Sequence, residues 1–454
     1  MKHIYSPYRM VQNYSKLLVL GASLIFFSCR NKPKEDFDES IKKINHVVVI
    51  YMENHSFDNL YGQFEGADGL SNASETAITQ LDDSDKPYTF LPEIPRSSVF
   101  PVNLPNRNFN IDQYVPSDQE IPDVTHRYYQ EIMQINGGKM NKFALHNHTK
   151  GLAMGYYKTE LLPLVKLAKE YTLCDRFFHS AFGSSFLNHQ WLIAAATPIF
   201  PNAPERHLAK LDSAGKLITD GTYTPEGFAV NTAYSVNAPH PKGLDTTVLM
   251  PNQLNPTIGD RLSEKGVSWA WYSGGWDDAL AGHPDGTFQY HHQPFIYYKS
   301  FADGTQAKKD HLKDETAFLA AARKGTLPAV SFVKPLGINN EHPGYSDVYH
   351  GENHALELVN AVLNGPNAKD ALIIVTYDEN GGFWDHVAPP VIDKWGPGSR
   401  IPAIMISPFV KKGFVDHTQY ETVSILSFIE RRWGLKPLTE RDKNANPLQH
   451  IFEF

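Results

Sequence analysis

The strongest constraint on the fold is a set of five short apolar runs spread along the 454 residues. The first, Ile44-Asn-His-Val-Val-Val-Ile-Tyr51, is rich in β-branched residues, has the length of one strand, and shows no regular polar alternation. Such a run is expected for a strand that is buried on both faces, as in parallel sheets. The other runs are Val267 to Tyr272, Ala329 to Val333, Ala371 to Tyr377 and Ile401 to Ser407.

Helical patterns lie between or after these runs, at Leu161–Glu170, Asn353–Asn364 and Thr422–Trp433. Strands that alternate with helices predict an α/β fold, with a mostly parallel central sheet and helices on both faces. In such folds the functional residues follow the carboxyl ends of the strands. Residues 64–122 and 199–260 are rich in Pro, Asn, Asp and Ser and weakly periodic. We interpret them as long loop insertions around the site rather than separate domains.

The N-terminus is typical of an export signal. Met1–Lys16 carries basic residues and no acidic ones, and the apolar run Leu17–Phe27 is too short to cross a membrane as a helix. Residues 1–28 resemble a lipoprotein-type signal peptide, after which Cys29 would take up lipid; an ordinary signal peptide cleaved nearby is the alternative. We therefore expect an exported protein, either periplasmic or anchored to the outer membrane through a lipid.

The rest of the chain is predicted to be one folded domain on a tether. The charged, aperiodic segment 29–43 is the predicted tether, and residues 44–454 form the domain. Cys29 and Cys174 are the only cysteines, so no disulfide framework is expected, and Cys174 is predicted to be a buried, inert thiol. The net charge of -8 becomes about -11 once residues 1–28 with their three positive charges are removed. An acidic chain without basic runs argues against nucleic-acid binding. The oligomeric state is not predicted.

Two groups of oxygen ligands follow two of the predicted strands. Glu53 and Asn54 follow the first run, and Asp378 and Glu379 follow the run at Ala371–Tyr377. At one edge of a parallel sheet, three carboxylates and an amide oxygen would converge and repel one another unless a cation lay between them. The alternative is that each pair caps a helix or turn. The two groups together favour a site for a divalent metal ion of unknown identity.

A candidate nucleophile lies in a Gly-Ser-Ser turn. Gly183, Ser184 and Ser185 precede an apolar helical pattern over Phe186–Ala196. Unpaired backbone N–H groups at the start of a helix attract phosphate and favour an alkoxide. These residues alone do not distinguish the two serines, and either is also explained as a simple helix N-cap.

Four histidines are candidates for contacts with an anion: His126, His291, His292 and His342. Taken singly, each is explained as well by a surface or structural role. The adjacent pair in Tyr290-His-His-Gln-Pro294 is more suggestive. An extended segment would point its two rings to opposite sides.

Three motifs carry a family resemblance: E-N-H-S-F-D-N-L-Y-G, Y-D-E-N-G-G-F-W-D-H-V-A-P-P and G-P-G-S-R-I-P-A-I-M-I-S-P-F. They resemble the phosphoesterase family of bacterial acid phosphatases A and non-haemolytic phospholipases C, which has an alkaline phosphatase-like fold. The first two are specific in order and spacing, and the resemblance runs from about Ile44 to the C-terminus. It implies metal-dependent hydrolysis of a small phosphate ester.

The resemblance also implies roles for single residues. Ser185-Phe-Leu-Asn188 matches the family's Ser/Thr-x-x-Asn nucleophile motif, which selects Ser185 as the nucleophile and as a metal ligand. Asp385 and His386 belong to the second motif, with a supporting or a structural role. The implied metal ligands besides Ser185 are Glu53, Asn54, Asp378 and Glu379, and the implied phosphate-contacting histidines are His126, His291, His292 and His342.

The implied reaction passes through a phosphoserine on Ser185. Serine at this position, and a chain that ends soon after Arg431-Arg-Trp-Gly434, both resemble the acid phosphatase branch. Imidazolium beside the phosphate would favour an acidic optimum. Two alternatives stand beside the acid phosphatase: a phospholipase C that cleaves phospholipid head groups, and a catalytically inactive surface lipoprotein that only binds.

Overall fold

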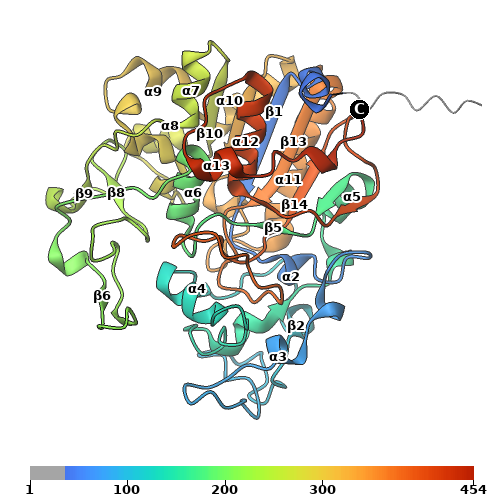
Figure 1. Ribbon diagram of the computed structural model, residues 1–454, viewed down its shortest axis with the longest axis vertical. Coiled ribbons are helices and arrows are strands. Elements are labelled where there is room, and N and C mark those ends of the chain that lie inside the picture. Colours follow the sequence, from blue (N-terminus) through green and yellow to red (C-terminus); the bar gives the residue numbers. More distant parts are fainter. Residues whose placement is uncertain (1–35) are drawn as a thin grey trace, which may run out of the picture. The chain divides into compact units, whose positions relative to one another are not determined.

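An eight-stranded sheet forms the centre of the protein (Figure 1). The structure is a computed structural model that describes residues 36–454. The strand order is β11-β10-β12-β1-β13-β14-β4-β15. The strands are β1 (His46–Met52), β4 (Thr172–Cys174), β10 (Trp269–Ser273), β11 (Leu312–Asp314), β12 (Val330–Lys334), β13 (Ala371–Tyr377), β14 (Ala403–Ile406) and β15 (Phe414–Asp416).

All five apolar runs form strands of this sheet, and the sheet is mostly parallel, as predicted. Strands β11, β10, β12, β1 and β13 are parallel neighbours. Strand β14, from the run at 401–407, is antiparallel to both β13 and β4. Its direction was not predictable, because a strand buried on both faces has the same apolar pattern whichever way it runs.

Helices cover both faces of the sheet. On one face, α10 (Glu315–Lys324) and α11 (Val348–Leu363) pack against each other and against the parallel strands. On the other, α6 (Ser185–Ala194) packs against α7 (Ile258–Glu264) and α12 (Thr422–Trp433), and the Tyr51 hydroxyl of β1 donates to the Asn188 carbonyl of α6 at 3.4 Å. The predicted α/β architecture is confirmed.

Two predicted helix starts are wrong. The pattern at Leu161–Glu170 becomes helix α5 only at Val165, because Leu161 belongs to a preceding 3-10 turn and Pro163 follows it. The pattern at Asn353–Asn364 begins earlier, at Val348 of α11, where the Asp347 side chain accepts a hydrogen bond from His350 N and caps the helix.

The folded unit begins before the predicted tether ends. Phe37–Ser40 forms helix α1 and Ile41–Lys43 a 3-10 turn; Ile41 is fully buried, and the Phe37 ring lies 6.0 Å from the Phe452 ring. These two apolar side chains explain why the segment packs on the domain. The predicted signal peptide and Cys29 lie outside the described residues.

The two long insertions contain only short elements. Figure 1 shows α3 and β2 of the first insertion at one end of the sheet, and β6, β8 and β9 of the second insertion at the left of the view. No helix in residues 36–454 is long and apolar enough to cross a membrane. The remaining elements are α2 (Phe57–Leu60), α3 (Glu75–Ile78), α4 (Tyr128–Ile135), α8 (Trp276–Leu280), α9 (Gln306–His311), α13 (Glu440–Asn444), β2 (Phe109–Asn110), β3 (Gly155–Tyr156), β5 (Phe177–Phe178), β6 (Lys210–Leu211), β7 (Leu217–Thr219), β8 (Tyr234–Ser235), β9 (Leu249–Met250) and β16 (Tyr420–Glu421).

Cys174 lies in β4 as a free, buried thiol, as expected. Burial raises its pKa well above the ordinary value, because the thiolate would lose its hydration. The residue is therefore an unreactive part of the core.

Candidate active site

The predicted oxygen ligands meet at the carboxyl edge of the sheet. Glu53 and Asn54 directly follow β1, and Asp378 and Glu379 directly follow the adjacent strand β13. The Asp378 N–H donates to the Met52 carbonyl at 3.1 Å, which fixes the ends of the two strands together. All four side chains are fully buried.

Helix α6 brings Ser185 to the same place. Its hydroxyl oxygen lies 3.3 Å from Glu53 Oε2, 3.3 Å from Asn54 Oδ1 and 3.4 Å from Glu379 Oε1. The side chain of Ser184 turns away and donates to the Val230 carbonyl at 3.0 Å. Neither hydroxyl caps the helix, so the N-cap explanation of this turn does not hold.

Asn54 is held in a conformation that few residues adopt. Its φ of 66° lies in the left-handed region, which asparagine tolerates better than most residues. A Cβ at Gly381 would lie 2.0 Å from the Asn54 carbonyl oxygen, so the two loops approach closely. One terminal atom of the Asn54 amide lies 3.1 Å from Glu53 Oε2, 3.0 Å from Asp378 Oδ1 and 3.2 Å from Glu379 Oε1. If this atom is the nitrogen, it donates to the three carboxylates and the amide oxygen accepts from His342 Nε2 at 2.9 Å; if it is the oxygen, it joins them as a cation ligand.

These contacts between oxygens fit a cation. Four oxygens without a hydrogen between them repel one another, unless the amide is turned over to donate or a positive ion lies among them. Separations of about 3 Å are those of neighbouring ligands around a hard divalent ion, and carboxylate, amide and hydroxyl oxygens are its usual ligands. Within residues 36–454, no hydrogen-bond donor reaches Asp378 Oδ2, which leaves a buried carboxylate oxygen for such an ion.

The electrostatics of the carboxyl groups point the same way. Burial raises the pKa of Asp378 well above its usual value, and the charge of Glu53 raises it further. Burial likewise raises the pKa of Glu379, with a further increase from Asp378. Protons or a cation must compensate these charges, and a divalent ion would let both groups ionise.

Lys334 is a charged member of the cluster that the sequence patterns did not reveal. It is the last residue of β12, and its Nζ lies 2.6 Å from Glu53 Oε1. Burial raises the pKa of Glu53, but Lys334 and His292 outweigh it and hold the pKa well below its usual value. The sequence feature that could have revealed Lys334 was its position at the end of an apolar strand.

A buried glutamate supports the turn before Ser185. The Glu131 carboxylate, on α4, accepts from the Gly183 N–H at 2.5 Å and from the Ser399 N–H and hydroxyl, each at 2.9 Å. His179 Nε2 lies 3.0 Å from the same carboxylate. Gly183 has a φ of 65°, and a Cβ there would lie 2.2 Å from the Tyr128 N atom. The turn therefore requires glycine.

His126 and His342 flank the oxygen cluster on its more exposed side. His126 Nε2 lies 3.9 Å from Glu379 Oε1, and His342 Nε2 lies 3.9 Å from Glu53 Oε2. Their rings are 5.3 Å apart, and each side chain keeps a small exposed fraction, whereas the carboxylates have none. The two imidazoles are thus placed between the buried oxygens and solvent.

The predicted geometry of His291 and His292 is wrong. They lie in a 3-10 turn, not an extended segment, so the two buried rings are only 4.7 Å apart. His292 Nε2 contacts Glu53 Oε1 at 2.7 Å, and burial lowers the pKa of His292 to about 4. His189 lies one helical turn after Ser185, and its ring stacks on that of His292 with 5.1 Å between the ring centroids. This residue was not predicted, although its spacing from Ser185 on α6 indicated that both side chains lie on the same side of the helix.

Asp385 and His386 belong to a separate ionic cluster. Asp385 Oδ1 accepts from Arg400 Nε at 2.8 Å, and His386 Nδ1 lies 2.6 Å from Asp58 Oδ2. Arg400 is fully buried and also donates to Asp58 at 3.0 Å. These contacts link the loops that carry Asp58, Asp385 and Arg400.

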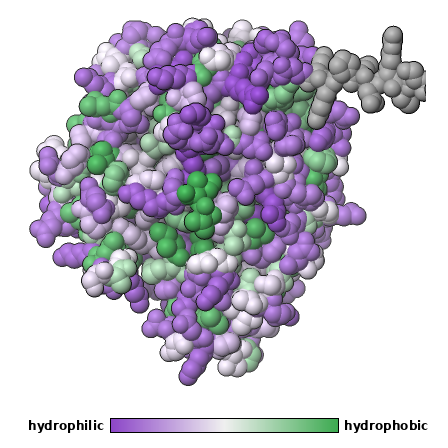
Figure 2. Space-filling view, in the orientation of Figure 1, coloured by the Kyte–Doolittle hydropathy of each residue, from purple (hydrophilic) through white to green (hydrophobic). Residues whose placement is uncertain are grey.

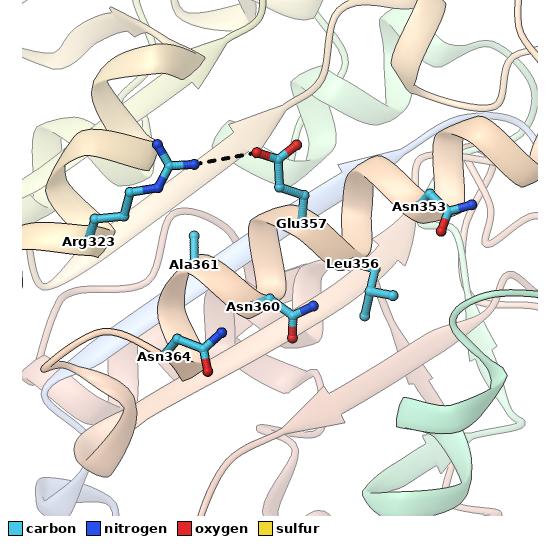
Figure 3. Close-up of a pocket in the computed structure, with 7 residues that line it drawn as sticks. All are labelled: Arg323, Asn353, Leu356, Glu357, Asn360, Ala361 and Asn364. Atoms are coloured by element: carbon cyan, nitrogen blue, oxygen red, sulfur yellow. Dashed lines mark hydrogen bonds and ion pairs between the residues drawn. The ribbon is translucent and has the colours of Figure 1, made fainter.

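A hollow on the opposite face of the sheet is not part of this site. Figure 3 shows its lining on α10 and α11, where the Arg323 and Glu357 side chains form an exposed ion pair at 3.4 Å. Its other lining residues are Asn353, Leu356, Asn360, Ala361 and Asn364. This lining brings together no group of catalytic side chains comparable to that around Ser185.

Comparisons with known proteins agree with the motifs. The model of the phosphoesterase family matches residues 44–436, the start expected from the sequence. Non-specific phospholipase C3 of Arabidopsis thaliana is 26% identical over 91% of this chain and 74% of that protein. Hemolytic and non-hemolytic phospholipase C of Pseudomonas aeruginosa are 24% and 23% identical over 87% of this chain, and it spans about half of their length, 53% and 55%.

Among solved structures, a protein of the alkaline phosphatase superfamily from Vibrio parahaemolyticus aligns with 72% of this chain and 75% of its own, with a TM-score of 0.35 and 11% identity. The family match covers most of the described residues and includes every residue of the oxygen cluster. The chain belongs to the phosphoesterase family and is a phosphoric ester hydrolase.

Proposed function

We propose that the protein hydrolyses phosphate monoesters in two steps through a phosphoserine on Ser185, with a divalent cation as cofactor. The observation that carries the proposal is the position of the Ser185 hydroxyl, at the start of α6 and within 3.4 Å of three of the other four oxygen ligands. The ligands would be Glu53, Asn54, Ser185, Asp378 and Glu379.

In the first step the Ser185 oxygen attacks phosphorus and the alcohol of the substrate leaves; in the second, water attacks the phosphoserine and releases phosphate. A bound cation would supply Lewis acidity that favours the deprotonated serine. The N–H groups at the start of α6, with His126 and His342, lie where they can stabilise negative charge on the phosphoryl oxygens.

Burial disfavours the protonated form of His292 and of His342 before substrate binds. Burial lowers the pKa of His342, and it lowers that of His292 to about 4. An imidazolium beside the phosphate therefore depends on the negative charge of the substrate, which raises the pKa of a neighbouring histidine. We propose that the preference for acidic pH, if measured, reports on the substrate complex rather than on the free enzyme.

A phospholipase C is the second candidate, favoured by an apolar groove beside the catalytic turn. Phe182, which directly precedes Gly183, lines this groove, and Val391 on its rim is fully exposed. Figure 2 shows apolar patches on one mainly hydrophilic face of the protein. The three relatives named above are phospholipases C, and this groove offers apolar contacts to part of an acyl chain.

A substrate panel tests these proposals. Nitrophenyl phosphate and phosphatidylcholine vesicles are supplied separately with Mg²⁺, Ca²⁺, Mn²⁺ or Zn²⁺ between about pH 5 and pH 8. The acid phosphatase proposal predicts cation-dependent release of nitrophenol that a chelator abolishes. Faster release of phosphocholine, reduced in Val391→Asp, would establish the second candidate instead. If the protein hydrolyses neither substrate with any of these cations, the result would favour the inactive binding lipoprotein.

We also propose that the protein is exported and anchored through a lipid on Cys29. The proposal rests on the basic N-terminus, the short apolar run and the cysteine that follows it. Cys29→Ser should move the protein from the membrane fraction to the soluble fraction. Membrane association that persists in this variant would contradict the lipid anchor.

A further inference from the structure

Lys334 places a positive charge inside the core, beside the catalytic cluster. Its side chain is fully buried, and its Nζ lies 2.6 Å from Glu53 Oε1 and 3.3 Å from the Met52 carbonyl. The Tyr51 ring lies 5.5 Å from the same nitrogen. A buried ammonium is costly unless a partner compensates its charge, so its pairing with Glu53 is the reason it can lie there.

The two carboxylate oxygens of Glu53 have different neighbours. Oε1 contacts Lys334 at 2.6 Å and His292 at 2.7 Å. Oε2 lies 3.3 Å from the Ser185 hydroxyl and 3.1 Å from the Asn54 side-chain amide. Only Oε2 therefore faces the oxygen cluster.

We propose that Lys334 is a positioning residue that makes Glu53 a one-oxygen ligand and matches the cluster to a single divalent cation. The inference rests on the proposed cation-assisted function. While Ser185 is protonated, the carboxylates of Glu53, Asp378 and Glu379 together with the Lys334 ammonium leave two negative charges, which one divalent ion neutralises. Without Lys334 a third negative charge remains, and a trivalent ion becomes the better match.

The same ammonium disfavours a second cation at one neighbouring group of side chains. Glu53, His189 and His292 each offer a ligand atom within 4.8 Å of the others, a group that resembles a metal site by residue type. Lys334 Nζ lies 2.6 Å from Glu53 Oε1 and so places a positive charge beside this group. A second ion there would lie against a like charge in a buried environment, which is unfavourable.

The test compares wild type with Lys334→Met, which keeps most of the side-chain volume, and Lys334→Arg, which keeps the charge. The full chain is stripped of cations and titrated calorimetrically with Mn²⁺ and with Tb³⁺. Lys334→Met should shift the ratio of the two dissociation constants toward Tb³⁺ by about tenfold or more, and Lys334→Arg should leave it near the wild-type ratio. A Lys334→Met ratio equal to wild type would overturn the inference. Wild type that binds neither ion would overturn the proposed function itself.

A second measurement needs no cation. Lys334→Met leaves Glu53 buried without its partner, so its melting temperature should fall below that of wild type. The double variant Lys334→Met with Glu53→Gln removes both charges and should melt higher than Lys334→Met alone. A double variant that melts no higher than the single variant would show that the ion pair does not hold Glu53, and would overturn the proposed role.

Discussion

The Asn188 side chain folds back from α6 onto Gly183, in the turn that carries Ser185. Asn188 Nδ2 donates to the Gly183 carbonyl at 2.7 Å and to the Ala181 carbonyl at 2.9 Å, and its Oδ1 accepts from the Ala181 N–H at 3.0 Å. The Ser-x-x-Asn spacing therefore has a physical reason. The asparagine lies one helical turn after the serine, where its amide can hold both strands of the turn.

Replacing Asn188 tests whether these hydrogen bonds hold the turn in place. Asn188→Ala leaves buried backbone groups of Ala181 and Gly183 without partners, so we expect a loss of about 1–3 kcal/mol in the free energy of unfolding and a fall in kcat. Asn188→Asp keeps the acceptor and loses the hydrogen bonds that Nδ2 donates, so its kcat should also fall. Urea unfolding and steady-state kinetics measure the two effects. Stability and kcat at wild-type values in Asn188→Ala would contradict a role of Asn188 in holding the turn.

Replacing His291 and replacing His292 should have different effects on cation binding. His292 contacts Glu53 Oε1 at 2.7 Å, so His292→Ala should weaken cation binding by about tenfold or more, as loss of a residue that supports a ligand does. Among the described residues, no hydrogen bond or ion pair joins His291 to the oxygen cluster, so His291→Ala should leave the cation affinity unchanged. It should still reduce turnover, because the family motif assigns His291 to the phosphoryl group. Metal titration and kinetics of both variants check this. Equal loss of cation affinity in both would contradict the distinction.

A buried carboxyl pair outside the cluster predicts a dependence of stability on pH. Burial raises the pKa of Glu352 to about 8, and Glu341, also buried, has its pKa raised by burial and by Glu352. Glu352 accepts from the Leu164 N–H at 2.7 Å and from the Tyr61 hydroxyl at 3.3 Å. The folded state binds a proton that the unfolded state releases above about pH 4.3, so this group lowers stability as pH rises from there toward 8.

Glu352→Gln removes this titration and can keep both contacts, with its oxygen on Leu164 and its amide on Tyr61. Its melting temperature relative to wild type should therefore rise between pH 5 and about pH 8. Glu93→Gln, which makes the same change at an exposed carboxylate, is the matched control and should show no such trend. A difference between Glu352→Gln and wild type that stays constant with pH would contradict the raised pKa.

The sequence predicted the sheet and the oxygen cluster because both follow from local patterns. Glu53 and Asp378 each come directly after a strand-length apolar run, and parallel strands bring such ends together. Lys334, His189 and Glu131 were missed. Each acts through a partner distant in the chain, as Lys334 does through Glu53, and a single sequence does not show which buried polar groups pair. The choice of Ser185 over Ser184 came from the family motif, and the opposite directions of their hydroxyls now give it a physical basis.

The formation of a phosphoenzyme tests the central claim most directly. The enzyme is mixed with ³²P-labelled phosphate ester and a divalent cation, quenched in acid, and the protein-bound label is counted. Wild type and Ser184→Ala should both retain label, because the Ser184 hydroxyl donates to the Val230 carbonyl and not to the cluster. Ser185→Ala should retain none and should not turn over substrate. Label that persists in Ser185→Ala would contradict the assignment of Ser185 as the nucleophile.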